Sequence, residues 1–312
     1  MSEDTTAHRA TPEPTVSGGA GALLEAARPH HWLKNGLLFV PMWLGHDVTV
    51  GNALLVLIGA ACFSAVASAG YLVNDLLDVA ADRAHRTKRL RPIASGRLSV
   101  GTARVAAGIA VVGATVVSAA ALGGAFTALL LLYLGLTLVY STWLKRLALV
   151  DVVMLAGLYT LRLFAGGVAV DVELSSWLLA FSTFVFLSLA FAKRYTEVVL
   201  HTDEAEASGE PVQVRGYLTV DAPLLIQFGV ASTFAAVMVF AMYLDSATVT
   251  DLYQRPHVLW LLLPVMLYWL GRVWLMTSRG SMNDDPVVFA LRDRVSWACG
   301  AVAVLLVMLA ND

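Results

Sequence analysis

Residues 52–83 read NALLVLIGAACFSAVASAGYLVNDLLDVAADR, an apolar stretch of membrane-spanning length that ends in acidic residues. Asp75, Asp78 and Asp82 are spaced three and four apart, and on a helix this spacing predicts that all three lie on one face. Three carboxylates so close together repel one another unless a cation lies between them. With Asn74 beside them, these oxygen ligands indicate a Mg²⁺ site, because Mg²⁺ is usually held by one or two carboxylates together with substrate phosphates.

Six cations follow the acidic motif: Arg83, Arg86, Lys88, Arg89, Arg91 and Arg97. One interpretation is an anchor at anionic lipid head groups. The other is a loop that grips phosphate, because a guanidinium group binds phosphate through two parallel hydrogen bonds. The two roles are compatible. Carboxylates that hold a metal beside cations that hold phosphate predict diphosphate chemistry on a lipid.

The composition predicts an all-α integral membrane protein. Of the 312 residues, 58% are hydrophobic and only 14% are charged, whereas soluble domains have about 25% charged residues. Residues 1–20 are expected to form a disordered cytoplasmic tail, and residues 21–312 a single transmembrane domain. Nine stretches have the length and apolarity of spans. They are 22–46, 52–73, 102–121, 124–143, 149–170, 175–197, 224–244, 257–277 and 295–310. The first is the weakest, because Pro29 and Pro41 interrupt it.

The distribution of Lys and Arg predicts the orientation. Of these 21 residues, Arg255 alone falls in a loop after an odd-numbered span, and Arg162 falls deep inside a span. The others lie on the N-terminal side or in loops and flanks after even-numbered spans. Because cytoplasmic loops carry the excess of Lys and Arg, we predict a multi-pass protein of the inner (plasma) membrane. Its N-terminus and its active site are then cytoplasmic, and its C-terminus lies outside.

Further candidate substrate-binding residues, cations for phosphate and Glu197 for a metal or a hydroxyl, lie at or inside the ends of other spans. They are Lys34 and Asn35, Tyr140 and Lys145, Arg162, and Lys193, Arg194 and Glu197. Arg162 is the most unusual, because a charge at that depth is costly and usually functional. A structural ion pair is the alternative, but Asp151 on the same helix is about 16 Å away. Gly166 and Gly167 would allow a close helix contact. At 193–197 the alternatives are a basic helix end and a second wall of the acidic site.

Taken together, these motifs make the chain resemble the UbiA superfamily of intramembrane prenyltransferases, over residues 24–310. The likeness is greatest to its decaprenyl-phosphate phosphoribosyltransferase-like members. Seven segments carry it: RPxxWxKN at 28–35, the acidic motif at 74–82, RPIASG at 91–96, YSxxLK at 140–145, LRxxAGG at 161–167, KRYxE at 193–197 and LRDR at 291–294. Typical aromatic prenyltransferases of the superfamily carry a second Asp-rich motif where this chain has only Glu197, and that departure favours a different donor.

The resemblance implies a nine-helix bundle that transfers 5-phosphoribose from phosphoribosyl pyrophosphate to a polyprenyl phosphate, a precursor lipid of the cell wall. Asn74, Asp75, Asp78 and Asp82 would hold Mg²⁺, and Asp75, Asp78 and Asp82 are the candidate catalytic residues. The substrate-binding set comprises Lys34, Asn35, Arg83, Arg89, Arg91, Tyr140, Lys145, Arg162, Lys193, Arg194 and Glu197. Three alternatives remain: a UbiA-type prenyltransferase that uses a prenyl diphosphate, a non-catalytic polyprenyl-phosphate carrier, and a structural membrane subunit. The sequence carries no sign of nucleic-acid binding, and a homo-oligomer stays open.

Overall fold

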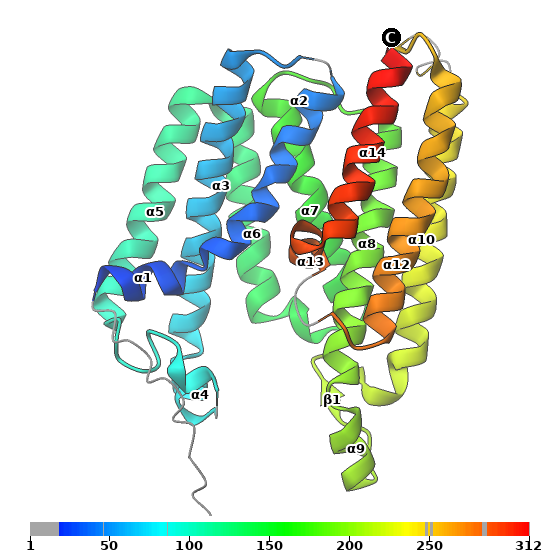
Figure 1. The fold of residues 1–312 in the computed structure, drawn as a ribbon. Helices are drawn as coiled ribbons and strands as arrows, with labels where there is room; N and C mark the ends of the chain where they lie inside the picture. The colour runs from blue at the N-terminus through cyan, green and yellow to red at the C-terminus, as the bar shows by residue number, and fades with distance from the viewer. Residues whose placement is uncertain are drawn as a thin grey trace, which may run out of the picture.

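The computed structural model describes residues 19–311 except 46, 86, 247, 248, 250, 251 and 283–285. The expected tail over residues 1–20 therefore lies outside the described residues but for its last two positions, and so does Arg86. Within the described part, the chain is helical except for a single two-stranded hairpin and the connecting loops (Figure 1).

Eight helical segments of the described chain are long and apolar enough to cross a membrane. They are built on α3 (Val50–Leu77), α5 (Val100–Ala121), α6 (Gly123–Thr142), α7 (Val150–Ala169), α8 (Ser176–Val199), α10 (Ala222–Leu244), α12 (Leu262–Ser278) and α14 (Arg294–Asn311). Thr49, Ser99 and Ser175 each precede a helix and accept a hydrogen bond from its third backbone N–H, as preferred N-cap residues do. All the expected spans but the first are confirmed to within a few residues.

The first expected span, 22–46, is not one continuous helix. It consists of α1 (Ala20–Ala27), the 3₁₀ helix η1 (Pro29–Phe39) and α2 (Val40–Leu44). Proline has no backbone N–H, so Pro29 and Pro41 each open a new segment. In Figure 1, α1 lies across one end of the bundle, and η1 and α2 then run up along it. The count of nine continuous spans therefore becomes eight, with a segmented N-terminal stretch beside them.

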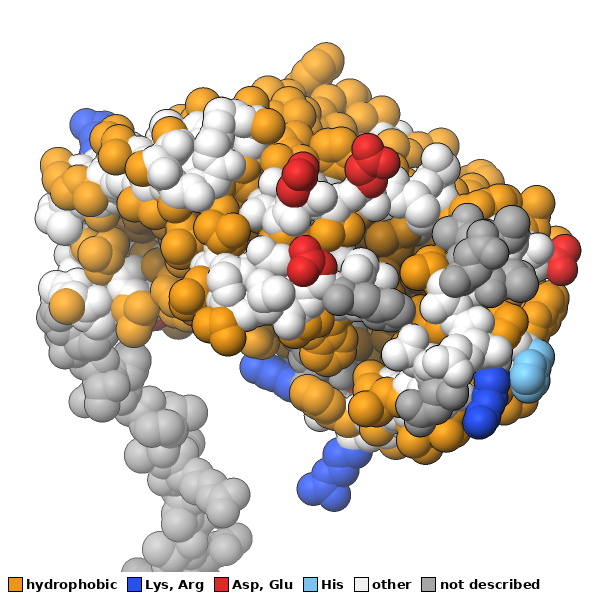
Figure 2. All heavy atoms as spheres, turned by 90° about the horizontal axis from the view of Figure 1, so that it is seen from above, with side chains coloured by type: hydrophobic (Ala, Val, Ile, Leu, Met, Phe, Trp, Pro, Cys, Tyr) orange, Lys and Arg blue, Asp and Glu red, His pale blue; other side chains and the backbone are white. Residues whose placement is uncertain are grey.

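The two ends of the bundle differ in their loops. At the end where α1 lies, the chain projects α4 (Val79–Ala84), α9 (Thr202–Ser208) and the hairpin of β1 (Gln213–Val214) and β2 (Tyr217–Leu218), whereas the C-terminus lies at the opposite end (Figure 1). Figure 2 shows that opposite end, where most of the acidic side chains lie near the middle and the Lys and Arg side chains at the margins. We call the end with α4 and the hairpin the loop end.

The short elements complete the chain. They are η2 (Lys88–Leu90), η3 (Leu144–Arg146), η4 (Thr219–Asp221), η5 (Pro256–Leu261) and α13 (Pro286–Arg292). Asp293, between α13 and α14, accepts hydrogen bonds from Ser296 N at 2.8 Å and from Arg272 Nη1 at 2.7 Å. This acid of the LRDR motif therefore begins the last helix and ties it to α12, which is a structural role.

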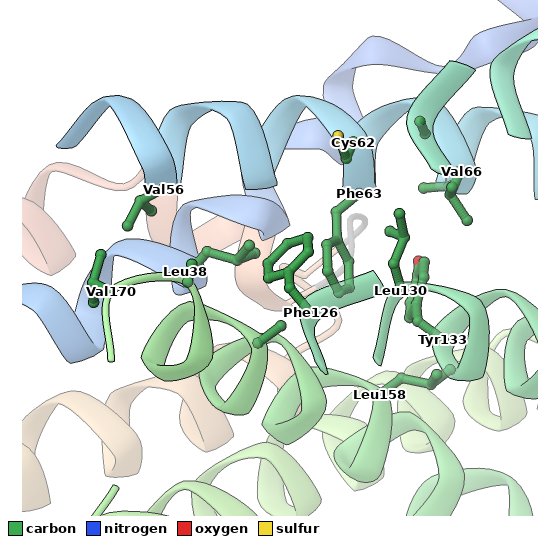
Figure 3. Packing of buried hydrophobic residues seen from close by; sticks show 14 of the residues in the cluster. Leu38, Val56, Cys62, Phe63, Val66, Phe126, Leu130, Tyr133, Leu158 and Val170 are labelled. Carbon is green, nitrogen blue, oxygen red and sulfur yellow. The ribbon is translucent and has the colours of Figure 1, made fainter. Parts of the chain in front are cut away.

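Buried residues are concentrated on α3, α7 and α8, whereas α5, α6 and α14 face largely outward. Phe63 lies at the centre, with its ring 5.8 Å from Phe126 and 5.0 Å from Tyr133 between centroids (Figure 3). By contrast, Val105, Ile109, Val112 and Val116 form an exposed stripe along α5. An apolar stripe at helical spacing that no other part of the protein covers is the surface a lipid bilayer solvates. The chain is accordingly a multi-pass membrane protein.

Candidate functional site

Two of the three motif aspartates converge on a pair of arginines at the loop end, which we call the acid–arginine cluster (Arg28, Asp75, Asp82, Arg91). Arg28 Nη2 donates to Asp75 Oδ1 at 2.8 Å. Arg91 Nη1 lies 3.2 Å from Asp75 Oδ1 and 2.7 Å from Asp82 Oδ2, so one guanidinium nitrogen joins both carboxylates. Asp75 is 2% exposed and Asp82 3%. Buried carboxylates are stable only when they are paired in this way.

Asp78 departs from the expected common face. Helix α3 ends at Leu77, and Asp78 has φ −93° and ψ 4°, outside the helical region, before α4 begins at Val79. This break turns Asp78 away from Asp75 and Asp82. Its side chain is 43% exposed and lies 4.0 Å from Lys145 Nζ, and Asn74 Nδ2 donates to it at 3.3 Å. The prediction of three carboxylates on one helical face is therefore wrong, because it assumed an unbroken helix.

The loop after α4 shapes the cluster from outside. Arg83 Nε donates to Ala94 O at 3.2 Å, and the side chains of Arg83 and Arg89 are exposed. Arg97 forms two hydrogen bonds with Glu25 on α1, at 2.6 and 2.7 Å. These hydrogen bonds hold the pKa of Glu25 below its usual value. The pair fastens α1 over the segment that carries Arg91, which keeps Arg28 and Arg91 on the same side of Asp75.

Arg162 lies in a second group, the buried cation cluster (Lys34, Asn35, Tyr133, Tyr159, Arg162). Its Nε donates to Asn35 Oδ1 at 2.9 Å, Nη1 to Leu158 O at 2.6 Å and Nη2 to Tyr133 OH at 2.8 Å. Among the described residues, no carboxylate forms an ion pair with Arg162. Neutral oxygens and aromatic rings thus hold a buried guanidinium that keeps its full positive charge.

Aromatic rings lie against cations of both clusters. Arg162 and Lys34 both lie over the Tyr159 ring, at 5.5 and 5.6 Å from its centroid. Arg28 lies 4.9 Å from the centroid of the Tyr71 ring on α3. Cations over aromatic faces are attracted by the ring quadrupole, so these contacts keep the positive side chains ordered inside an otherwise apolar bundle.

Tyr140 lies in the last turn of α6, and Lys145 lies just beyond the end of that helix. Tyr140 is half-buried, and Lys145 is 25% exposed beside Asp78. Burial lowers the pKa of Lys145, the Asp78 carboxylate partly offsets this, and the positive charges of Arg215, Arg146 and Lys88 lower it further. Lys145 is therefore a cation that loses its proton more readily than an ordinary surface lysine.

Arg194 and Glu197 belong to a third group, the hairpin cluster (Asp151, Arg194, Glu197, Arg215, Tyr217). Arg194 is fully buried; its Nη2 lies 2.6 Å from Asp151 Oδ2, and its Nη1 contacts Glu197. Arg215 Nε lies 3.0 Å from the same Glu197 oxygen. Arg194 is thus enclosed by the protein's own acids, and a second wall of the acidic site at this position stays a prediction. Lys193, next to it, is half-buried.

Several residues of these clusters were not predicted from the sequence. Arg28 belongs to a motif that is also typical of an interfacial anchor. Asp151 was considered only as an ion-pair partner of Arg162. Tyr133, Arg215 and Tyr217 carry no local signal, because their roles depend on contacts between distant segments. Asp151 had the best signal: it is an acid in the first turn of an apolar helix.

The oxygen donors of this region suit magnesium. Among the described residues, no three His, Cys, Asp or Glu side chains come together as a metal site. Two buried carboxylates do share one arginine nitrogen, and Asp78 with Asn74 offers further oxygens close by. Mg²⁺ needs only one or two carboxylates when substrate phosphates supply the remaining ligands. Asp75 and Asp82 therefore fit a magnesium–diphosphate group, and Asn74 and the more exposed Asp78 are further oxygen donors in the adjoining chain.

Comparison with known families gives a clear match. Residues 36–299 match the model of the UbiA prenyltransferase family. The structure is also similar to a UbiA homolog from Archaeoglobus fulgidus bound to DMAPP and Mg²⁺. Their TM-score is 0.66 at 17% sequence identity, over 92% of this chain and 96% of that one. At this identity the likeness concerns the fold.

Three relatives differ in what is known of them. The uncharacterized protein y4nM of Sinorhizobium fredii is 40% identical over 89% of this chain, which spans about half (54%) of that protein's length. The nodulation protein NoeC of Azorhizobium caulinodans is 34% identical over 88% of both chains. The decaprenyl-phosphate phosphoribosyltransferase of Mycobacterium tuberculosis is 33% identical over 95% of this chain and 94% of the enzyme.

Proposed function

Because this chain belongs to the UbiA prenyltransferase family and is a transferase, we propose that it moves 5-phosphoribose from phosphoribosyl pyrophosphate to a polyprenyl phosphate. Similarity to a decaprenyl-phosphate phosphoribosyltransferase over nearly the whole of both chains supports this donor and acceptor. The observation that carries the proposal is a single buried carboxylate pair, Asp75 and Asp82, held by Arg28 and Arg91. In the hairpin cluster, Asp151 and Glu197 are paired with Arg194 and Arg215, so neither acid is free to hold a second metal.

The acid–arginine cluster binds the pyrophosphate of the donor. Asp75 and Asp82, with Asn74 and Asp78, would hold Mg²⁺, which when bound neutralises diphosphate charge and stabilises it as a leaving group. Arg28 and Arg91, already at 2.8 and 3.2 Å from Asp75, turn part of their hydrogen-bonding capacity to the phosphate oxygens. Arg83 and Arg89, exposed on the adjoining loop, lie on the solvent side of the same group.

The acceptor needs no strong general base. An oxygen of the lipid phosphate is ionised at neutral pH, and it attacks the anomeric carbon of the ribose. The new bond between that carbon and the lipid phosphate forms as the bond to pyrophosphate breaks, and pyrophosphate leaves with the electron pair. Lys34 and Arg162 lie deeper in the bundle, where their charge stabilises phosphate oxygens in a medium of low dielectric constant.

The loop end is the cytoplasmic end in this proposal. Phosphoribosyl pyrophosphate is soluble and cytoplasmic, and the basic loops lie at the loop end, as the positive-inside rule requires. The polyprenyl chain enters from the bilayer with its phosphate at the same level. The protein is then a multi-pass enzyme of the plasma membrane with its C-terminus outside.

A second candidate function is prenyl transfer. The A. fulgidus homolog of the same fold binds DMAPP with Mg²⁺, and the similarity to y4nM (40% identity) and NoeC (34% identity) leaves the donor open. In that case the acid–arginine cluster binds a prenyl diphosphate, and the lipid moves to another acceptor.

A product assay separates these functions. Purified protein in lipid nanodiscs, Mg²⁺ and a polyprenyl phosphate are incubated with either phosphoribosyl pyrophosphate or geranylgeranyl diphosphate, and the lipids are analysed by mass spectrometry. We expect a polyprenyl-phosphoryl-ribose phosphate and one pyrophosphate per product. A prenylated product with the second donor alone would replace the proposal with prenyl transfer. Substrate binding without any release of pyrophosphate would point to a carrier.

A further inference from the structure

The tip of the hairpin is fixed against the loop between α6 and α7. Arg215 and Gly216 form its turn, and Arg215 has a φ of 59°. A side-chain carbon at Gly216 would lie 2.5 Å from Ala148 N and 2.6 Å from Arg146 O, closer than any side chain can approach. The hairpin backbone therefore touches the backbone of the loop that carries Lys145.

Tyr217 locks this contact. Its hydroxyl accepts a hydrogen bond from Leu149 N at 2.7 Å and donates one to Asp151 Oδ1 at 2.7 Å. The side chain is 3% exposed. Leu149 itself has a φ of 64°, which is unfavourable for leucine and must be held by its surroundings. The hairpin thus fixes the shape of the segment between Lys145 and α7.

In this arrangement the positive charges of Arg215 and Lys145 influence each other. Lys145 is 25% exposed and Arg215 36%, so both charged ends are open to solvent. Each has one acid near it, namely Asp78 at 4.0 Å from Lys145 and Glu197 at 3.0 Å from Arg215. Arg215 is one of the cations whose charge lowers the pKa of Lys145. Both side chains are therefore partly exposed, and the positive charge of each is offset by one nearby acid.

Charge balance sets this region apart from the other clusters. In the acid–arginine cluster, Asp75 and Asp82 match Arg28 and Arg91. In the hairpin cluster, Asp151 and Glu197 match Arg194 and Arg215. Lys145 and the exposed Arg146 beside it have Asp78 alone among the ion pairs of the described residues. Positive charge therefore exceeds negative charge at Lys145 and Arg146, in the loop that the hairpin tip contacts.

We propose that Lys145 and Arg215 form a second anion subsite, which binds a phosphomonoester group separately from the diphosphate held at the acid–arginine cluster. This inference rests on the proposed function and deepens it. Phosphoribosyl pyrophosphate carries a phosphomonoester at the end opposite its diphosphate, and a polyprenyl phosphate also ends in one. A prenyl diphosphate has only an apolar tail beyond its diphosphate. A subsite of this kind selects reactants with a second, separate phosphate.

The test compares two classes of anion on the full-length protein in nanodiscs. The phosphomonoester probes are ribose 5-phosphate and farnesyl phosphate, and the diphosphate probe is inorganic pyrophosphate with Mg²⁺. Binding is measured by equilibrium dialysis, independently of turnover. We expect Lys145→Gln and Arg215→Gln each to weaken phosphomonoester binding about tenfold, the value of one charge-assisted hydrogen bond. Arg215→Gln, whose acidic partner is Glu197, should change pyrophosphate binding by less than about twofold, and Lys145→Gln should change it less than it changes phosphomonoester binding.

Two further variants keep the test interpretable. Arg215→Lys retains the charge and should restore most of the phosphomonoester affinity. Arg279→Gln removes an exposed arginine after α12, at the same end of the bundle, and should leave both affinities unchanged. Retained pyrophosphate binding shows that each variant is folded.

The outcomes separate the subsite from the proposed function. Loss of ribose 5-phosphate affinity alone assigns the subsite to the donor, and loss of farnesyl phosphate affinity alone assigns it to the acceptor. Equal weakening of all three probes, no weakening of any, or an unmodified protein that binds neither phosphomonoester would overturn the inference. The proposed function is judged separately, by the lipid product of the unmodified protein.

Discussion

Asp75 and Asp78 lie three residues apart, yet their carboxylates have different surroundings. Asp75 is buried between two arginines, whereas Asp78 is half exposed beside Lys145. Their spacing in the sequence predicted that the two carboxylates lie on the same helical face. The difference arises at the single non-helical residue between α3 and α4, which no residue pattern marks, since the tract has neither Gly nor Pro.

Asp75→Asn should abolish most of the activity. The change keeps the shape of the side chain but removes the charge that pairs with Arg28 and Arg91 and that would hold Mg²⁺. We expect kcat/KM to fall roughly 100-fold or more, with saturation at higher Mg²⁺. Steady-state kinetics over a Mg²⁺ titration measures both effects.

The matched control for this change is Asp47→Asn, which makes the same substitution at an exposed residue between α2 and α3, at the end opposite the loop end. It should leave the kinetics unchanged. An Asp75→Asn protein with the wild-type Mg²⁺ dependence would contradict the metal assignment.

Lys145 should impose an alkaline limit on substrate binding. Burial, with the charges of Arg215, Arg146 and Lys88, lowers its pKa, and Asp78 offsets this only in part. Because the charged form binds phosphate, KM should rise roughly tenfold per pH unit once the pH exceeds this lowered pKa. Arginine stays protonated throughout, so Lys145→Arg should remove the rise. Profiles of KM against pH for both proteins provide the measurement.

The exposed Lys88 offers the control. Lys88→Arg makes the same change on the neighbouring loop and should keep the alkaline rise of the wild type. If the rise persists in Lys145→Arg, another group is responsible for it.

At the scale of elements, the sequence was a good guide to the apolar helices and a poor one to their junctions. Eight spans follow from runs of about 20 apolar residues, because bilayer thickness fixes that length. The segmented η1 and α2, the break at Asp78 and the hairpin all lie where polar and apolar residues mix. Their conformations depend on partners such as Asp151 and Tyr217 that are far apart in sequence.

The contact between η1 and α7 depends on Gly166. A side-chain carbon there would lie 2.2 Å from Leu38 O, so Gly166→Ala must push η1 away from α7. This should lower the unfolding free energy by about 1 to 3 kcal/mol. Activity should fall as well, because the Asn35–Arg162 hydrogen bond joins the same two elements. Thermal unfolding in detergent and the product assay test the two effects.

Gly157, on the same helix, has no atom within 4 Å of an added side-chain carbon. Gly157→Ala should therefore be neutral or slightly stabilising, since alanine favours helix over glycine. Equal effects of the two substitutions would argue against the close contact as the cause.

For the whole molecule, the sequence predicted the family and the gathering of the long charged loops at one end. The identity of the donor, by contrast, depends on the contacts of a few side chains. The motifs that matched the family are spread from residue 28 to residue 294, so their joint presence is specific even though single motifs are not. The pairing of Arg28 with Asp75 and of Arg194 with Asp151 could not be read from them, because pairing is a property of the packed bundle.

The orientation of the protein in the membrane can be tested directly by cysteine labelling. In a background with Cys62 and Cys299 replaced by Ser, a single cysteine is placed at Glu173, at the end opposite the loop end, or at Ser208 on α9. Both positions are exposed. A membrane-impermeant maleimide should label position 173 in intact cells and position 208 only after permeabilisation. The reverse pattern would move the site to the outer face.

The order in which the chain is synthesised gives the acid–arginine cluster a further property. Its members, and the Glu25–Arg97 contact beside them, all come from residues 25–97, whereas the hairpin cluster is complete only when Tyr217 has been made. At 5–20 residues per second, these events are separated by on the order of ten seconds. The partners that neutralise Asp75 and Asp82 are therefore synthesised before the second half of the bundle, and the pairing of these buried charges does not depend on it.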